Sequence, residues 1–135
     1  MTNGNGTRLD YRDGAFLAAM PRPVRRLPGA DIVRIVECRM ADPISHGEEV
    51  FHILLTADAM LLVGPFVAGA LGALEAFRRD FAAIPSERRL VRTVPWRFRE
   101  AWFLGLRPFP VAGLVLAPRP DLAAFGFLTE GPTDE

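Results

Sequence analysis

The sequence of 135 residues predicts a small single α+β domain, in which a short antiparallel or mixed sheet packs against a helical pair. Three observations favour this fold class. The length suits one hydrophobic core, half of the residues are apolar while about a quarter are charged, and the hydrophobic period changes along the chain between strand and helix values. We expect an extended arm at residues 1–30, a core domain at 31–117 and an acidic, proline-rich tail at 118–135.

The arm and the first strand are predicted from local composition. Residues 21–28, PRPVRRLP, contain three prolines, which disfavour helix and strand alike. The next segment, DIVRIVECRM at residues 31–40, is rich in β-branched residues and leads into a turn-like sequence, so it predicts a strand. Its even positions are mostly apolar and should face inward, with Arg34 as the exception, and Cys38 is expected to be a small core residue.

Two helices are predicted between residues 45 and 83. Ser45 and Glu48 have the spacing of a capping box, and the apolar residues that follow share one face at helical periodicity. Gly64 and Pro65 end this helix and start the next one, which has one bulky face and one face of small residues. Small residues allow the backbone of a neighbour to approach closely, so this face is a candidate partner-binding surface. The small-residue face consists of Ala68, Gly69, Gly72, Ala73 and Ala76.

The last third of the chain predicts a strand at residues 89–94, a short helix at 95–105 and a strand at 111–118. The short helix interleaves arginines with aromatic residues, a combination found at protein interfaces and in nucleic-acid grooves. Because the formal net charge is zero and the adjoining segments are acidic, we favour a protein partner and do not expect nucleic-acid binding. The residues assigned to this Arg/aromatic patch are Arg92, Trp96, Arg97, Arg99 and Trp102.

Residues 53–74 form an apolar run whose twenty-two residues reach the length of a membrane-spanning helix. An ionised Asp58 inside such a helix would cost about 2.5–3.5 kcal/mol, and the Gly64–Pro65 pair interrupts it. Two helices in a protein core explain the same residues without that cost. Since the chain also has a single cysteine and no recognisable secretion signal, we expect a cytoplasmic protein, with membrane association as the alternative.

The sequence contains no catalytic or cofactor motif, and three residues remain as functional candidates. Asp58 falls on the apolar side of the first predicted helix. It would form a buried ion pair with an arginine, lie where the helix face meets solvent, or, if buried without a partner, become a candidate for proton transfer. Cys38 and His52 lie near carboxylates, but the spacing matches no zinc motif, and His52 is expected on a solvated helix face. We therefore predict no metal and no cofactor.

The predicted function is that of a non-catalytic accessory or structural subunit of a larger assembly. It would bind a partner protein, or a second copy of itself, through the small-residue face and the Arg/aromatic patch. The two ends have opposite charge, with five arginines against two acids in residues 1–30 and one against four in 118–135. All sixteen basic residues are arginine, a bias that we attribute to a bacterial genome rich in G and C. Two alternatives stay open: a single-pass membrane-anchored subunit that uses residues 53–74, and a small enzyme or ligand-binding domain that uses Asp58.

Overall fold

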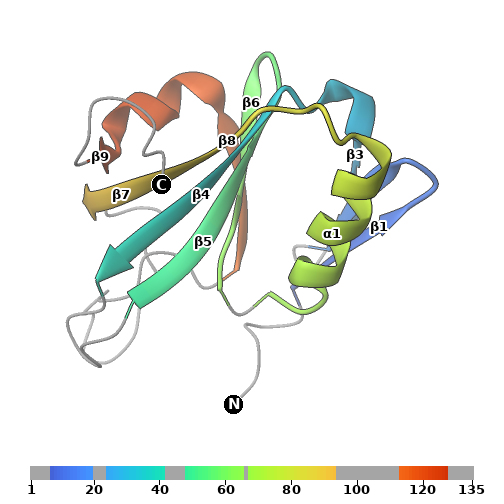
Figure 1. Cartoon of the computed structure of the whole chain (residues 1–135), viewed down its shortest axis with the longest axis horizontal. Coiled ribbons are helices and arrows are strands. Elements are labelled where there is room, and N and C mark those ends of the chain that lie inside the picture. The colour runs from blue at the N-terminus through green and yellow to red at the C-terminus, as the bar shows by residue number, and fades with distance from the viewer. Residues whose placement is uncertain (1–6, 20–23, 42–47, 66, 94–112, 128–135) are drawn as a thin grey trace.

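The computed structural model describes residues 7–19, 24–41, 48–65, 67–93 and 113–127. In these ranges the chain forms nine strands in two sheets and a single α-helix (Figure 1). The fold is therefore mostly β. The predicted fold class, a sheet packed against a helical pair with an extended arm and tail, is wrong.

The smaller sheet is an antiparallel meander of β1 (Arg8–Arg12), β2 (Ala15–Ala19) and β3 (Val24–Pro28), in that order. Asp13 and Gly14 connect its first two strands with φ values of 54° and 76°, the left-handed conformations that a two-residue Asp-Gly hairpin turn requires. The extended arm predicted for residues 1–30 is thus wrong over these strands.

The position of Pro28 is compatible with a strand. Pro28 is the last residue of β3, and β3 is an edge strand of the small sheet. Edge positions tolerate proline, because the missing N–H would otherwise point away from the neighbouring strand. The other two prolines of the segment lie outside the described residues.

The larger sheet has six strands in the order β8-β6-β5-β4-β7-β9. Only β4 and β7 pair in parallel; the other pairs are antiparallel. The three strands predicted at 31–40, 89–94 and 111–118 are confirmed as β4, β7 and β8, with shifted bounds. The strands are β4 (Arg34–Ala41), β5 (Glu48–Leu55), β6 (Ala59–Val63), β7 (Ser86–Thr93), β8 (Leu114–Pro118) and β9 (Gly126–Phe127).

The first predicted helix is wrong, because its residues form the antiparallel pair β5 and β6. β5 lies inside the sheet and both of its faces are buried, with Phe51 and Ile53 in one core and Leu54 in the other. A strand buried on both faces has a continuous apolar run rather than an alternating one, and a short continuous run also satisfies a helical wheel. The predicted cap, Ser45, lies outside the described residues.

The second predicted helix is confirmed only as α1 (Ala70–Asp80), which begins about five residues later than expected. Gly69 precedes it with a φ of 78°, and a Cβ added there would lie 2.7 Å from the carbonyl oxygen of Leu9. Only glycine fits this position, because any side chain would meet the backbone of β1. From there the helix lays Leu74 and Phe77 into the core.

Two hydrophobic cores lie on opposite faces of the larger sheet. The first is enclosed by this sheet, α1 and the small sheet, which Figure 1 shows on the same side as α1. The second lies under the 3-10 helix η4 (Arg119–Ala124) and β9; Phe125 belongs to this buried cluster, and Leu122 packs against the cluster. The predicted acidic tail at 118–135 is therefore wrong for η4 and β9, which cover a core face.

The apolar run at residues 53–74 is divided among three elements. It begins in β5, passes through β6 and ends in the first turns of α1. Among the described residues, no helix has the length and apolar character that crossing a membrane requires. The cytoplasmic location stays a prediction.

Candidate functional site

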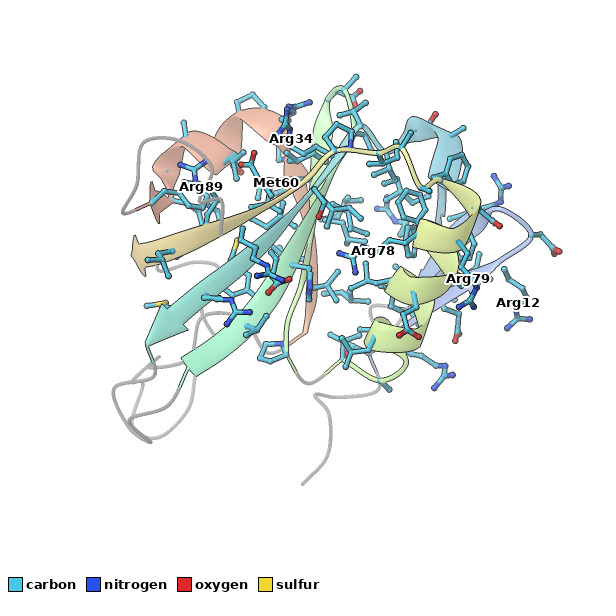
Figure 2. All side chains as sticks on the ribbon, viewed as in Figure 1. Arg12, Arg34, Met60, Arg78, Arg79 and Arg89 are labelled. Atoms are coloured by element: carbon cyan, nitrogen blue, oxygen red, sulfur yellow. The ribbon has the colours of Figure 1, made fainter. Side chains whose placement is uncertain are left out.

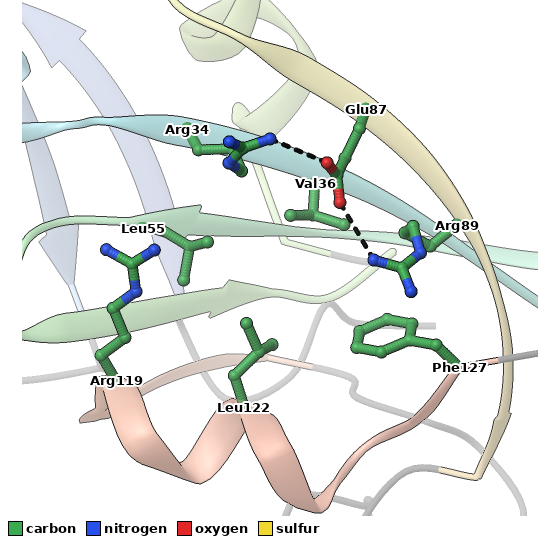
Figure 3. A pocket seen from close by; sticks show the side chains of 8 residues that line it. All are labelled: Arg34, Val36, Leu55, Glu87, Arg89, Arg119, Leu122 and Phe127. Carbon is green, nitrogen blue, oxygen red and sulfur yellow. Dashed lines mark hydrogen bonds and ion pairs between the residues drawn. The ribbon is translucent and has the colours of Figure 1, made fainter. Parts of the chain in front are cut away.

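A pocket of about 450 Å³ opens on the face of the larger sheet that η4 and β9 cover (Figure 3). This volume lies within the range of roughly 300–1,000 Å³ that is usual for small-molecule sites. The pocket combines charged side chains with an apolar floor. It is lined by Arg34, Val36, Leu55, Glu87, Arg89, Arg119, Leu122 and Phe127.

Strand register brings the sheet residues of the pocket to one face. Val36 of β4 lies opposite Glu87 of β7, and Arg34 lies opposite Leu55 of β5. Residues that are paired across strands share a face, as do residues two apart along a strand. Arg89 therefore lies on the same side as Glu87. The pocket wall follows directly from the pairing of β5, β4 and β7.

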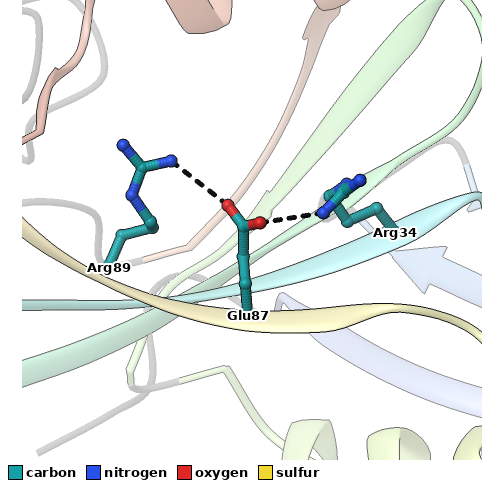
Figure 4. Close-up of polar contacts among 3 residues, drawn as sticks. All are labelled: Arg34, Glu87 and Arg89. Atoms are coloured by element: carbon teal, nitrogen blue, oxygen red, sulfur yellow. Dashed lines mark hydrogen bonds and ion pairs between the residues drawn. The ribbon is translucent and has the colours of Figure 1, made fainter. Parts of the chain in front are cut away.

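Glu87 holds two of the arginines, as Figure 4 shows. Arg34 Nη1 donates to Glu87 Oε1 at 2.8 Å, and Arg89 Nη1 donates to Glu87 Oε2 at 3.2 Å. The Glu87 side chain is only 14% exposed, so these charge-assisted hydrogen bonds are partly shielded from water. One carboxylate thus compensates one of the two guanidinium charges that it contacts.

Arg119 enters the pocket from η4 and is held by the turn between β5 and β6. Its Nη1 donates to the backbone carbonyl of Thr56 at 2.7 Å, and its backbone N–H donates to the carbonyl of Asp58 at 3.0 Å. Within the described residues no carboxylate pairs with Arg119. The described lining of the pocket therefore contains three arginines and one glutamate.

The far end of the pocket is aromatic. The Arg89 guanidinium lies over the ring of Phe127, with 4.4 Å between Cζ and the ring centroid. Stacking of this kind attracts the cation to the ring face and fixes the plane of the guanidinium. Between Arg89 and the arginines at the other end, Val36, Leu55 and Leu122 provide an apolar floor.

The arginines that Figure 2 labels belong to two different parts of the fold. In Figure 2, Arg34 and Arg89 lie on the side of η4 and β9, whereas Arg12, Arg78 and Arg79 lie on the side of α1. The latter three are exposed. Only the first group lines the pocket.

The predicted small-residue face is not one surface. Ala73 is buried beneath α1, Gly69 forms the turn before the helix, and Ala68 pairs with Arg8 of β1. Gly72 is exposed with no atom near the position of an added Cβ, and Ala76 is half-buried. Most of these small residues therefore serve packing inside the chain.

The Arg/aromatic patch falls largely outside the described residues. Trp96, Arg97, Arg99 and Trp102 all lie there, and the structure describes the backbone of Arg92 in β7 but not its side chain. Binding of a partner through this patch stays a prediction.

Asp58 lies in the turn between β5 and β6 and is exposed, so of the alternatives left open for it, the structure has it at the surface and not in a buried ion pair. The first predicted helix would have turned its side chain toward the core, whereas a turn directs it to solvent. The Thr56 hydroxyl donates to Asp58 Oδ1 at 3.3 Å, a side-chain contact typical of turns. Asp58 does not line the pocket, but its carbonyl holds Arg119.

His52 and Cys38 are both buried in the larger sheet. His52 is only 9% exposed and lies on β5, a central strand. The prediction that His52 lies on a solvated helix face is therefore wrong. Burial lowers the pKa of His52, helped by Arg78 and opposed by Glu37. Burial also raises the pKa of the Cys38 thiol. Within the described ranges, no three potential metal ligands of the His, Cys, Asp and Glu types come together.

Sequence reasoning missed the pocket residues, although one signal was present. Arg34 was noted as the single charged residue among the inward positions of its strand, which is the pattern of a polar group placed inside a cavity. The alternation of Glu87 and Arg89 on β7 is a second signal. No sequence pattern placed Arg119 beside them, because 63 residues separate it from Thr56.

Comparisons of this chain with protein-family models, with curated proteins and with solved structures find no match.

Proposed function

We propose that this chain is a binding module that holds a small organic anion in the pocket between the larger sheet and η4. A single observation carries the proposal: among the described residues, three guanidinium groups and one carboxylate line a pocket that also has apolar side chains. Buried or partly buried cationic charge is costly unless it is compensated, so a bound anion is favoured there.

Arg34 and Arg119 have hydrogen-bond donors to spare for such an anion. A guanidinium carries five N–H donors. Within the described residues Arg34 uses Nη1 toward Glu87, and Arg119 uses Nη1 toward Thr56. The Arg34 side chain is 41% exposed, so a ligand arriving from solvent can reach it. The apolar floor would then cover the body of the ligand.

The test is a calorimetric titration with phenylacetate and phenyl phosphate, and with neutral 2-phenylacetamide as the comparison. The anions should bind and the amide should not. Arg119→Gln should weaken anion binding about tenfold or more, because a hydrogen bond to a charged group contributes about 1.5–3 kcal/mol.

Arg88→Gln is the matched control. Arg88 lies on β7 next to Arg89, but it faces the opposite side of the sheet and contacts Glu37. The same charge is removed in both variants, so long-range electrostatics cannot account for a difference between them. Equal binding of the amide and the anions, or equal losses in the two variants, would refute the pocket as the binding site.

The second candidate function is the accessory subunit that associates through α1. One observation favours it: Leu71 is 73% exposed on the outer side of the helix, beside the open position at Gly72. Leu71→Ser should then abolish self-association measured by sedimentation equilibrium, without lowering the free energy of unfolding. A parent chain that is monomeric at all concentrations would contradict association with a second copy.

A further inference from the structure

We propose that the outer edge of β8 pairs with the same edge of a second copy of this chain, so that their two larger sheets join into one antiparallel sheet. β8 is the terminal strand of the larger sheet and pairs with β6 on its inner side. None of its residues lines the pocket, so this surface is separate from the proposed anion site. The inference follows from the hydrogen-bond register, the exposure and the composition of β8.

The register of β6 and β8 shows which backbone groups of β8 point away from the sheet. The N–H of Gly64 donates to the carbonyl of Gly113 at 2.9 Å, just before β8 begins. Hydrogen-bonded and non-hydrogen-bonded pairs alternate along an antiparallel ladder, and the pairing of β6 with β8 continues without a shift. The N–H and C=O groups of Leu114 and Leu116 therefore point outward, away from β6.

The outer edge of β8 is also accessible at its centre. Within the described part of the chain, no strand pairs with this side of β8. Leu116 is 38% exposed, whereas Leu61, which lies opposite it on β6, is 2% exposed. A strand edge with outward N–H and C=O groups is a template for pairing with another strand. The partner that fits this edge is therefore an extended strand.

The other strand edges of the two sheets are protected against such pairing. On β1, the N–H of Leu9 donates to the carbonyl of Ala68 at 2.9 Å. The edge strand β3 contains Arg25, Arg26 and Pro28, and β9 has only two residues. Contacts, charges, prolines and short length are the usual means by which proteins prevent edge pairing. β8 has five residues, none of them charged, and its proline is the last of the five.

A second copy of β8 satisfies these outward groups symmetrically. When Leu114 lies opposite Leu116 of the second copy, each of these residues both donates and accepts, which gives four backbone hydrogen bonds between the copies. Val115 then lies opposite Val115 of the second copy on the two-fold axis, and an isologous contact of this kind closes as a dimer. Because β8 is uncharged, no like charges on the paired strands oppose each other.

Disulfide cross-linking of the full chain tests this register. Val115→Cys should form an intermolecular disulfide on oxidation with copper phenanthroline, because residues opposite each other in a non-hydrogen-bonded pair have Cα atoms about 4.5 Å apart. Ala117→Cys is the matched control. Ala117 is half-buried like Val115 and faces the same side of β8, but its two copies would lie about 14 Å apart, too far for a disulfide. The native Cys38 is fully buried and does not interfere.

Removing an outward N–H tests the hydrogen bonds between the copies. Leu116→Pro removes a donor that points away from β6, so the ladder with β6 is retained, while two of the four bonds between the copies are lost. Sedimentation equilibrium over the micromolar range should show a dimer for the parent chain. The dissociation constant of Leu116→Pro should be about tenfold higher or more.

Val24→Pro is the control for the effect of a proline at a strand edge. The hydrogen bond from Gly29 to Gly14 places the N–H of Val24 on the outer side of β3, so this variant also removes an outward donor. It should leave the dimer unchanged, because β3 belongs to the other sheet.

The outcomes decide between β8 and other modes of association. A parent chain that is monomeric over the whole range, or cross-linking of Ala117→Cys as rapid as that of Val115→Cys, would overturn the inference. A dimer that persists in Leu116→Pro and dissociates in Leu71→Ser would assign the association to α1 instead. If Leu116→Pro does not fold, the cross-linking comparison still decides. Anion binding does not require the dimer, so its failure and that of the dimer are seen separately.

Discussion

Replacing Glu87 by glutamine should destabilise the protein, because this carboxylate contacts two arginines of the pocket. The amide keeps an oxygen acceptor for one arginine but presents its NH₂ group to the other, so one of the contacts at 2.8 and 3.2 Å is lost. Among the described residues, the lining of the pocket would then contain three arginines and no carboxylate.

The magnitude follows from the burial of the partners. Breaking a fully buried pair costs about 3–5 kcal/mol, but Arg34 is 41% exposed and Arg89 18% exposed. We therefore expect a loss of about 2–3 kcal/mol in the free energy of unfolding. For a chain of this length, that corresponds to a fall of about 6–15 °C in the melting temperature.

Glu37→Gln is the control on the opposite face of the same sheet. Glu37 also contacts two arginines, Arg39 at 3.0 Å and Arg88 at 3.9 Å. The difference lies in the second partner, because Arg88 is 58% exposed whereas Arg89 beside Glu87 is 18% exposed. An ion pair as exposed as that of Arg88 contributes about 1 kcal/mol or less. Urea unfolding of both variants measures the difference. If Glu87→Gln costs no more than Glu37→Gln, the pocket carboxylate does not compensate buried charge, and the reasoning is refuted.

Three further predictions concern single sites. Gly69→Ala should lower the free energy of unfolding by about 2 kcal/mol or more, because Gly69 has a positive φ and its added Cβ would meet the Leu9 carbonyl. Gly72→Ala on the open helix surface should instead raise the free energy of unfolding by about 0.5–1 kcal/mol. Urea unfolding measures both changes. The pKa of His52 is lowered in the folded state, so as the pH falls the unfolded chain takes up the proton at a higher pH than the folded chain does. The free energy of unfolding should therefore decrease as the pH drops below about 6.5. A His52→Leu variant should lose this dependence between pH 8 and 5. The Cys38 thiol is fully buried with a raised pKa, so Ellman's reagent should react with it only at the rate of unfolding, and rapid labelling of the native protein would contradict this.

The sequence predicted those elements whose pattern is local. β4 is marked by β-branched residues, β7 and β8 are short apolar segments between proline and glycine breaks, and α1 has an apolar face that repeats at helical spacing. β5 and β6 were mistaken for a helix because burial on both faces removes the alternation that identifies a strand. The small sheet was not predicted, because the three prolines at 21–28 disfavour a strand there, although Asp13 and Gly14 form a standard hairpin signal.

The candidate site could be predicted only in part, for a different physical reason. A charged Arg34 at an inward position indicates a cavity, but it does not say which residues complete that cavity. Glu87 reaches Arg34 through parallel pairing of β4 and β7, across 53 positions of the chain. Pairing between distant segments leaves no periodic trace in the sequence, so the pocket became visible only in the fold.

The same distant pairing has a kinetic consequence. Because β4, β7 and η4 must all be in place before Arg34, Glu87 and Arg119 surround the pocket, the anion site should be among the last features to form during folding. A ligand that binds there would then stabilise the native state without stabilising the folding transition state. It should slow unfolding in proportion to its occupancy and leave the rate of folding unchanged.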